Sequence, residues 1–167
     1  MVRGRSKPAG GLSAAEVREE DVDVTFMVWL THRATTDLVD AALAPAGLDG
    51  DEFAIYSVLT AAPGITPTEL ARWMAAPPTT VSSYVKRFEA RGHVQREPNP
   101  VDRRSYRLKL TPAGQRAYRA AAALFVPLRT RVANSLGTRE DDVREALLIL
   151  RTVLDEIRHA PVDETDP

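Results

Sequence analysis

The stretch Arg91 to Thr111 reads RGHVQREPNPVDRRSYRLKLT, and this stretch decides the fold. On both sides of Pro98-Asn99-Pro100 apolar and polar side chains alternate, which is the period of a half-buried β-strand. The two runs therefore predict a β-hairpin with Arg103 and Arg104 at or near its tip. Positive charge is concentrated at the turn and on the second strand. Such a cationic hairpin suits a nucleic-acid partner.

A helix is predicted directly before the hairpin, from about Thr79 to Arg91, with Gly92 as its C-terminal cap. Its apolar side holds Val81, Val85 and Phe88. The opposite side carries short hydroxyls and then cations: Thr79, Thr80, Ser82, Ser83, Lys86 and Arg87. Small side chains at a helix N-terminus allow close approach to base edges, and the free backbone N–H groups favour phosphate. We predict that this side contacts DNA; the alternative is the solvated face of a structural helix.

The hairpin tip supplies a second predicted contact. The long guanidinium groups of Arg103 and Arg104 can reach into a minor groove, whose narrowness concentrates negative potential. Asp102 beside them is expected to orient an arginine through a charge-assisted hydrogen bond. The alternative is an ordinary surface hairpin with a local ion pair.

Capping signals predict two helices before residue 79. Asp49 and Glu52 have the spacing of a capping box, and Thr66-Pro67-Thr68-Glu69 is a stronger helix start with proline in the first turn. The short helix after Thr66 and the helix after Thr79 are joined by a tight turn, which predicts a helix-turn-helix.

Longer helices are predicted at both ends of the chain. One runs from about Glu16 to Ala44 and is apolar on most sides, so its own core or a second subunit must bury it. Another begins at Thr111-Pro112, and Pro127 within it predicts a kink or a break. A last helix repeats apolar residues at intervals of three and four: Val143, Ala146, Leu147, Leu150, Val153, Leu154 and Ile157.

Composition limits the classes of function. The 167 residues are 44% hydrophobic and 27% charged, as in globular proteins. Net charge is −1, yet residues 79–119 carry ten cations and three acidic groups, a local charge of +7. The absence of cysteine excludes disulfides and thiol chemistry, and three isolated histidines indicate no metal site. With no membrane-length apolar run, secretory signal, nucleophile elbow or phosphate loop, we expect a soluble, cytoplasmic protein that is not an enzyme and needs no cofactor.

Three motifs resemble the MarR (multiple antibiotic resistance regulator) family of winged-helix transcription regulators. These are Thr66–Ala71 (TPTELA), Thr80–Gly92 (TVSSYVKRFEARG) and Asn99–Gly114 (NPVDRRSYRLKLTPAG). The last motif, an Asp-x-Arg-Ser wing leading into Leu-x-Leu-Thr and a helix, is fairly specific. Helix order and lengths match from about Glu16 to His159.

The resemblance implies a mainly α fold with a small β-hairpin wing, in which a winged helix-turn-helix joins a helical dimerisation lobe. Its segments would be a disordered N-terminal arm (1–13), a dimerisation helix (14–48), a DNA-binding lobe (49–111), dimerisation helices (112–159) and an acidic disordered tail (160–167). A homodimer would bind a pseudo-palindromic operator on double-stranded DNA and act as a repressor. The implied DNA contacts are Thr66, Thr79, Thr80, Ser82, Ser83, Lys86, Arg87, Arg103, Arg104 and Ser105, with Asp102 orienting Arg104.

Many such regulators release DNA when a small aromatic or phenolic effector enters the cleft between the lobes. Phe26, Trp29, His32 and Tyr56 lie on the elements that would line this cleft and are the candidate ligand residues; the alternative is that they belong to the core. Two other functions remain open. The first is a DNA-binding protein that does not respond to a ligand, and the second is a winged-helix module that binds an acidic protein partner.

Overall fold

The computed structural model describes residues 22–160. Within this range the chain is mainly helical and has one two-stranded antiparallel sheet, which confirms the predicted fold class. The predicted arm (1–13) and all but the first residue of the predicted tail (160–167) lie outside the described residues. The elements are α1 (Val24–Leu43), the 3-10 turn η2 (Ala44–Ala46), α2 (Gly50–Ala61), α3 (Pro67–Trp73), α4 (Pro78–Ala90), β1 (Val94–Pro98), β2 (Tyr106–Leu110), α5 (Pro112–Leu136), the 3-10 turn η3 (Gly137–Arg139) and α6 (Glu140–His159).

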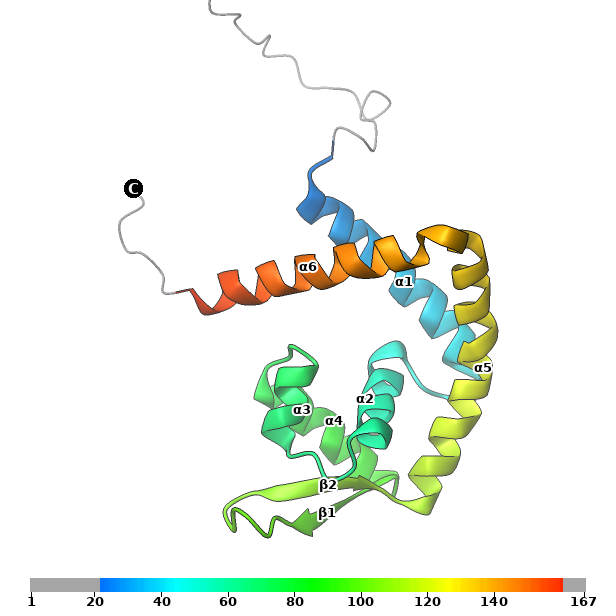
Figure 1. Cartoon of the computed structure of the whole chain (residues 1–167). Coiled ribbons are helices and arrows are strands. Elements are labelled where there is room, and N and C mark those ends of the chain that lie inside the picture. Colours follow the sequence, from blue (N-terminus) through cyan, green and yellow to red (C-terminus); the bar gives the residue numbers. More distant parts are fainter. Residues whose placement is uncertain (1–21, 161–167) are drawn as a thin grey trace, which may run out of the picture.

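The elements form two groups connected by α5 (Figure 1). Helices α2, α3 and α4 and the hairpin lie together at one end, and α1 and α6 lie at the other. Helix α5 packs against α1 near one group and against α2 near the other. The end of α6 nevertheless reaches the first group, because Arg158 Nη1 donates to Ala75 O, between α3 and α4, at 3.0 Å.

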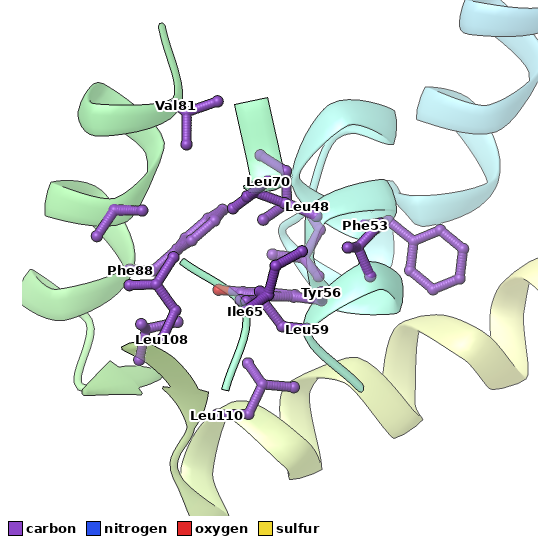
Figure 2. Close-up of a cluster of buried hydrophobic side chains, with 14 of the residues drawn as sticks. Leu48, Phe53, Tyr56, Leu59, Ile65, Leu70, Val81, Phe88, Leu108 and Leu110 are labelled. Carbon is purple, nitrogen blue, oxygen red and sulfur yellow. The ribbon is translucent and has the colours of Figure 1, made fainter. Parts of the chain in front are cut away.

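The hydrophobic core lies among α2, α3, α4 and the hairpin. Figure 2 shows Tyr56, Leu70, Val81, Phe88 and Leu108 converging there from four different elements. Each is at most 1% exposed. The apolar side predicted for the helix after Thr79 is therefore the side that packs into the core.

The second strand has the predicted alternation, since Leu108 and Leu110 are buried and Lys109 between them is exposed. In the first strand Val94, which pairs with Leu110, is the one buried residue, and Arg96, which pairs with Leu108, is exposed, so the alternation predicted for that strand is not observed. The segment before α3 is attached to the same hairpin, because Leu108 N–H donates to Ile65 O at 2.9 Å and Gly64 N–H donates to Leu108 O at 3.1 Å. The wing and the helix-turn-helix therefore form one packed unit.

Helix α1 begins at Val24, so the predicted start near Glu16 is wrong. The carboxylate of Asp23 accepts hydrogen bonds from the N–H groups of Thr25 and Phe26 at 2.9 and 3.1 Å, and this cap sets the helix start. Residues 16–21 lie outside the described residues. Within the helix Leu43 alone is buried by the chain itself.

Helix α5 runs unbroken through Pro127, so a break is not observed there. Proline removes the N–H that would bond to the carbonyl of Ala123, four residues earlier. Both residues are exposed, so water can satisfy the free carbonyl while the opposite side of α5 stays packed. The exposed position of Pro127 therefore reduces the free-energy cost of the missing hydrogen bond to the Ala123 carbonyl.

Candidate nucleic-acid interface

Helices α3 and α4 form the predicted helix-turn-helix. The turn between them passes through Ala75, whose φ of 50° is the one positive φ of a non-glycine residue in the described chain. Helix α4 then begins at Pro78 with no side-chain cap on its N–H groups. Pro78 has no N–H, and the N–H groups of Thr80 and Val81 donate to Pro77 O at 3.0 and 3.2 Å. In the first turn of α4 this leaves the Thr79 N–H without a partner among the described residues, and it can donate to a phosphate.

The outer side of α4 is available for contact. Thr79, Thr80, Ser82, Ser83 and Lys86 are all exposed, and their side chains have no hydrogen-bond or ion-pair partner within residues 22–160. The structure thus gathers five of the predicted DNA contacts on one surface of one helix.

Arg87 has a different environment from the other predicted contacts on α4. Its guanidinium lies 3.1 Å from Oε1 of Glu52, a residue of α2, and 4.6 Å from the centre of the Tyr84 ring. Its side chain is directed to α2 and is half-exposed, at 48%. The sequence prediction missed this pairing because Glu52 had been assigned to a capping box. Asp49 does accept from the Glu52 N–H at 2.7 Å, but the carboxylate of Glu52 points to α4 instead of back to the cap.

The wing tip is shaped by short polar side chains. Asn99 is buried between the strands; its amide donates to Ser105 Oγ at 2.7 Å, and its oxygen accepts from the Val101 N–H at 3.1 Å. Ser105, predicted to touch DNA, thus also holds the turn closed. Asn99 was not among the predicted site residues, although an Asn between two prolines is a turn signal.

Asp102 acts on the wing backbone. Its Oδ1 accepts a hydrogen bond from the backbone N–H of Arg104 at 2.9 Å, and its carbonyl accepts from the Ser105 N–H. In the described residues it forms no ion pair with Arg103 or Arg104, so the predicted bond from the carboxylate to an arginine side chain is not observed. Both guanidinium groups are exposed and project from a turn that Asp102 and Asn99 shape.

Much of the local positive charge is paired. Arg96 makes two short bonds to Glu89 at 2.6 and 2.7 Å, and this contact raises the pKa of Arg96. Lys109 lies 3.1 Å from Glu97, and the lysine lowers the pKa of that carboxyl. Among the described residues, the cations without a carboxylate partner include Lys86 on the exposed side of α4 and Arg103 and Arg104 in the wing turn.

Thr66, another predicted DNA contact, is the N-cap of α3. Its hydroxyl accepts from the Glu69 N–H at 3.3 Å, and its backbone N–H donates to Glu69 Oε2 at 2.8 Å, which together form the predicted capping box. The hydroxyl also donates to Glu69 Oε2 at 2.7 Å. The Thr66 hydrogen bonds hold the pKa of Glu69 below its ordinary value. Contact with DNA stays a prediction for this residue.

The four ligand candidates do not share one site. Tyr56 is fully buried, packs 4.5 Å from the Phe88 ring and lies 2.9 Å from His93 Nδ1, so it is a core residue in this chain. Phe26 and Trp29 stack on each other at 5.5 Å on the exposed side of α1. His32 lines an open pocket with Asp40 and Asp49. An effector site that combines all four is not formed within the described chain.

Within residues 22–160 no helix combines the length and the apolar character that crossing a bilayer requires. No group of three or more potential metal-ligating side chains comes together in the same range.

Comparison with known proteins identifies relatives. The model of the MarR family matches residues 46–105, which span α2, the helix-turn-helix and most of the wing. An HTH-type transcriptional repressor of Mycobacterium tuberculosis is 27% identical over 113 residues, covering 68% of this chain and 81% of the relative.

Solved structures share the fold over a longer range. The transcriptional regulator MosR of M. tuberculosis, solved in complex with DNA, has a TM-score of 0.73 and 24% identity, covering 82% of this chain and 99% of that one. The transcriptional repressor CouR, solved with a 23-mer DNA duplex, has a TM-score of 0.70 and 24% identity, covering 87% and 99%.

Proposed function

Because the chain belongs to the MarR family of winged-helix transcription regulators, we propose that it binds operator DNA as a homodimer and represses transcription. It is a regulator and not an enzyme. Relatives that carry this fold have been solved on DNA, which supports DNA as the partner. A regulator that binds operator DNA is expected to act in the cytoplasm.

The observation that carries the DNA-binding proposal is the surface of α4. Five exposed side chains without partners in the described residues lie on its outer side, and the helix start is uncapped. Short hydroxyls at a helix start can approach base edges in the major groove, while Lys86 reaches a phosphate. Arg104 at the wing tip would enter the minor groove, and Arg103 would contact a phosphate.

The proposal of a dimer rests on the apolar residues of α1 and α6. Phe26 and Trp29 on α1 are 48% and 52% exposed, and Leu147 and Leu154 on α6 are 55% and 46% exposed. No residue of α6 is buried within the chain. Apolar surface on two long helices is expected to be covered by another subunit. A two-fold dimer would present two copies of α4 to a two-fold symmetric DNA site.

Release by a small aromatic or phenolic effector is the finer part of the proposal. An effector would act by favouring a spacing of the two α4 helices that does not fit the operator. Phe26, Trp29 and His32 on α1 are the candidates that remain accessible, and Tyr56 would act only through the core.

The test is binding of the full chain to a labelled duplex from its own promoter region, measured by gel shift at several salt concentrations. A site should contain an inverted repeat with half-site centres about one helical turn apart. Affinity should fall steeply with salt because several phosphates are neutralised. A dimer with no preference over a shuffled duplex at physiological salt would contradict the proposal.

A further inference from the structure

Glu52 is a charged side chain buried at the junction between α2 and α4. The residue is 2% exposed, and its Oε1 lies 3.1 Å from Arg87 Nη2 and 3.0 Å from Arg91 Nη1. No N–H of either arginine is aligned on Oε1 as a hydrogen bond, so these contacts are close ion pairs. A buried carboxylate without a cation is strongly unfavourable, so the two arginines stabilise Glu52 in this position.

Further contacts connect the same two helices. Asp51, the neighbour of Glu52, accepts a hydrogen bond from the Tyr84 hydroxyl at 2.9 Å, and burial together with this bond raises the pKa of Tyr84 to about 12. The Tyr84 ring in turn lies beneath the Arg87 guanidinium. The second and third turns of α4 are thus attached to the first turn of α2.

The first turn of α2 is attached to α1 as well. The Gly50 N–H donates to Asp40 Oδ1 at 2.7 Å, and Asp40 lies near the end of α1. A continuous path of polar contacts therefore leads from α1 through the start of α2 to α4. Glu52 occupies the step of this path that reaches the outer, cationic side of α4.

We propose that Glu52 is a positioning residue for DNA recognition, which holds Arg87 and Arg91 against α2 and so keeps Arg87 off the DNA backbone. This inference rests on the proposed function, since it concerns how α4 meets DNA. Two parts of α4 would then have different roles. The hydroxyl-rich start contacts the groove, and Arg87 in a later turn does not bind phosphate unspecifically.

The division has a direct electrostatic consequence. Each phosphate that a protein neutralises makes the slope of log affinity against log salt steeper by about 0.9. A freed Arg87 would add about 0.9 per subunit to that slope and would strengthen binding to any duplex at low salt. The preference for operator over shuffled DNA would then decrease, because the added contact carries no sequence information.

The experiment compares the full chain with Glu52→Gln, Arg87→Ala and the double variant, using fluorescence anisotropy with a promoter duplex and its shuffled counterpart. Glutamine keeps the shape of the side chain and removes its charge. Asp141→Asn is the control, since it removes one negative charge from an 89% exposed site on α6. Circular dichroism establishes that each variant is folded.

We expect the slope of log affinity against log salt to be steeper by about 0.9 per subunit in Glu52→Gln. The same slope should equal that of the wild type in Arg87→Ala, in the double variant and in Asp141→Asn. Merely structural weakening would lower affinity without changing the slope. Wild-type slope in Glu52→Gln, or a slope in Arg87→Ala shallower by about 0.9 per subunit, overturns the inference while leaving DNA binding intact. If Glu52→Gln does not fold, the Arg87→Ala slope still decides. Absence of promoter preference in the wild type would instead overturn the proposed function, and this inference with it.

Discussion

Gly114 is the position where one added methyl group should be most damaging. It lies in the first turn of α5, where the helix crosses the start of β1, and it is buried. A Cβ at Gly114 would lie 2.1 Å from the backbone oxygen of His93 and 2.9 Å from its carbonyl carbon. Because the obstacle is backbone, no side-chain rotation relieves the clash. Helix and strand would have to separate by about 1 Å to reach ordinary contact.

The separation would break the contacts that hold α5 to the wing. Thr111 N–H donates to His93 O at 2.9 Å, and Thr111 Oγ1 donates to Gly92 O at 2.7 Å. Loss of these two bonds costs about 1 kcal/mol each, and overpacking adds about 1–3 kcal/mol. The better helix propensity of alanine returns about 0.5–1 kcal/mol. We therefore expect Gly114→Ala to lower the free energy of unfolding by about 2–4 kcal/mol.

Urea unfolding followed by circular dichroism, at one fixed protein concentration, measures this change. Gly50→Ala is the matched control, because its added Cβ would meet side-chain atoms of Asp40 and Val39 at 3.2 Å, which can shift slightly. The control should lose less than about 1 kcal/mol. An unchanged midpoint in Gly114→Ala would refute the reasoning, since the clash would then be relieved without breaking the contact between α5 and β1.

Three further predictions concern charge, assembly and DNA. The hydrogen bonds from Thr66 lower the pKa of Glu69, so the stabilisation by the ionised carboxylate is present above the ordinary carboxyl pKa of 4.5 and is lost as pH falls through the folded-state pKa. The difference in urea midpoint between the wild type and Glu69→Gln should therefore vanish in acid. A difference that does not depend on pH would count against the cap. Leu154→Glu should shift the protein from dimer to monomer in sedimentation, because it places a charge on the apolar side of α6; an unchanged dimer would exclude this side from the interface. Arg104→Ala should weaken operator binding by about 1–3 kcal/mol with dimerisation unchanged, and full affinity would remove Arg104 from the contact surface.

Local features of the fold were predictable from the sequence. The capping box at Thr66 and Glu69 and the hairpin around Pro98 to Pro100 depend on residues a few positions apart, and the structure has both. The start of α1 was misplaced because the acidic residues before Val24 are all candidate caps, and Asp23 supplies the hydrogen bonds. Of the kink or break expected at Pro127, the break is absent, and that position is exposed to solvent.

The candidate interface was predictable in part. The hydroxyls of α4 were placed correctly on its outer side, because the apolar period of a helix defines both of its faces. The partners of the charged residues were not predictable. Arg87 and Glu52 are far apart in the chain. The carboxylate of Asp102 has several possible donors within two residues, namely the backbone N–H of Arg104 and the guanidinium groups of Arg103 and Arg104. Only the relative placement of helices and turn backbone selects among them.

The order of residues alone determines that this chain forms a cationic hairpin behind a hydroxyl-faced helix, because periodicity and caps act over one or two turns. Tertiary packing decides which cations remain free to meet a phosphate. An arginine is paired or free according to whether a carboxylate lies within about 4 Å of its guanidinium. For Arg87 that carboxylate belongs to Glu52, on another helix. The burial of Tyr56 against Phe88 and the exposure of α6 are decided in the same way, by which surfaces the folded chain brings together.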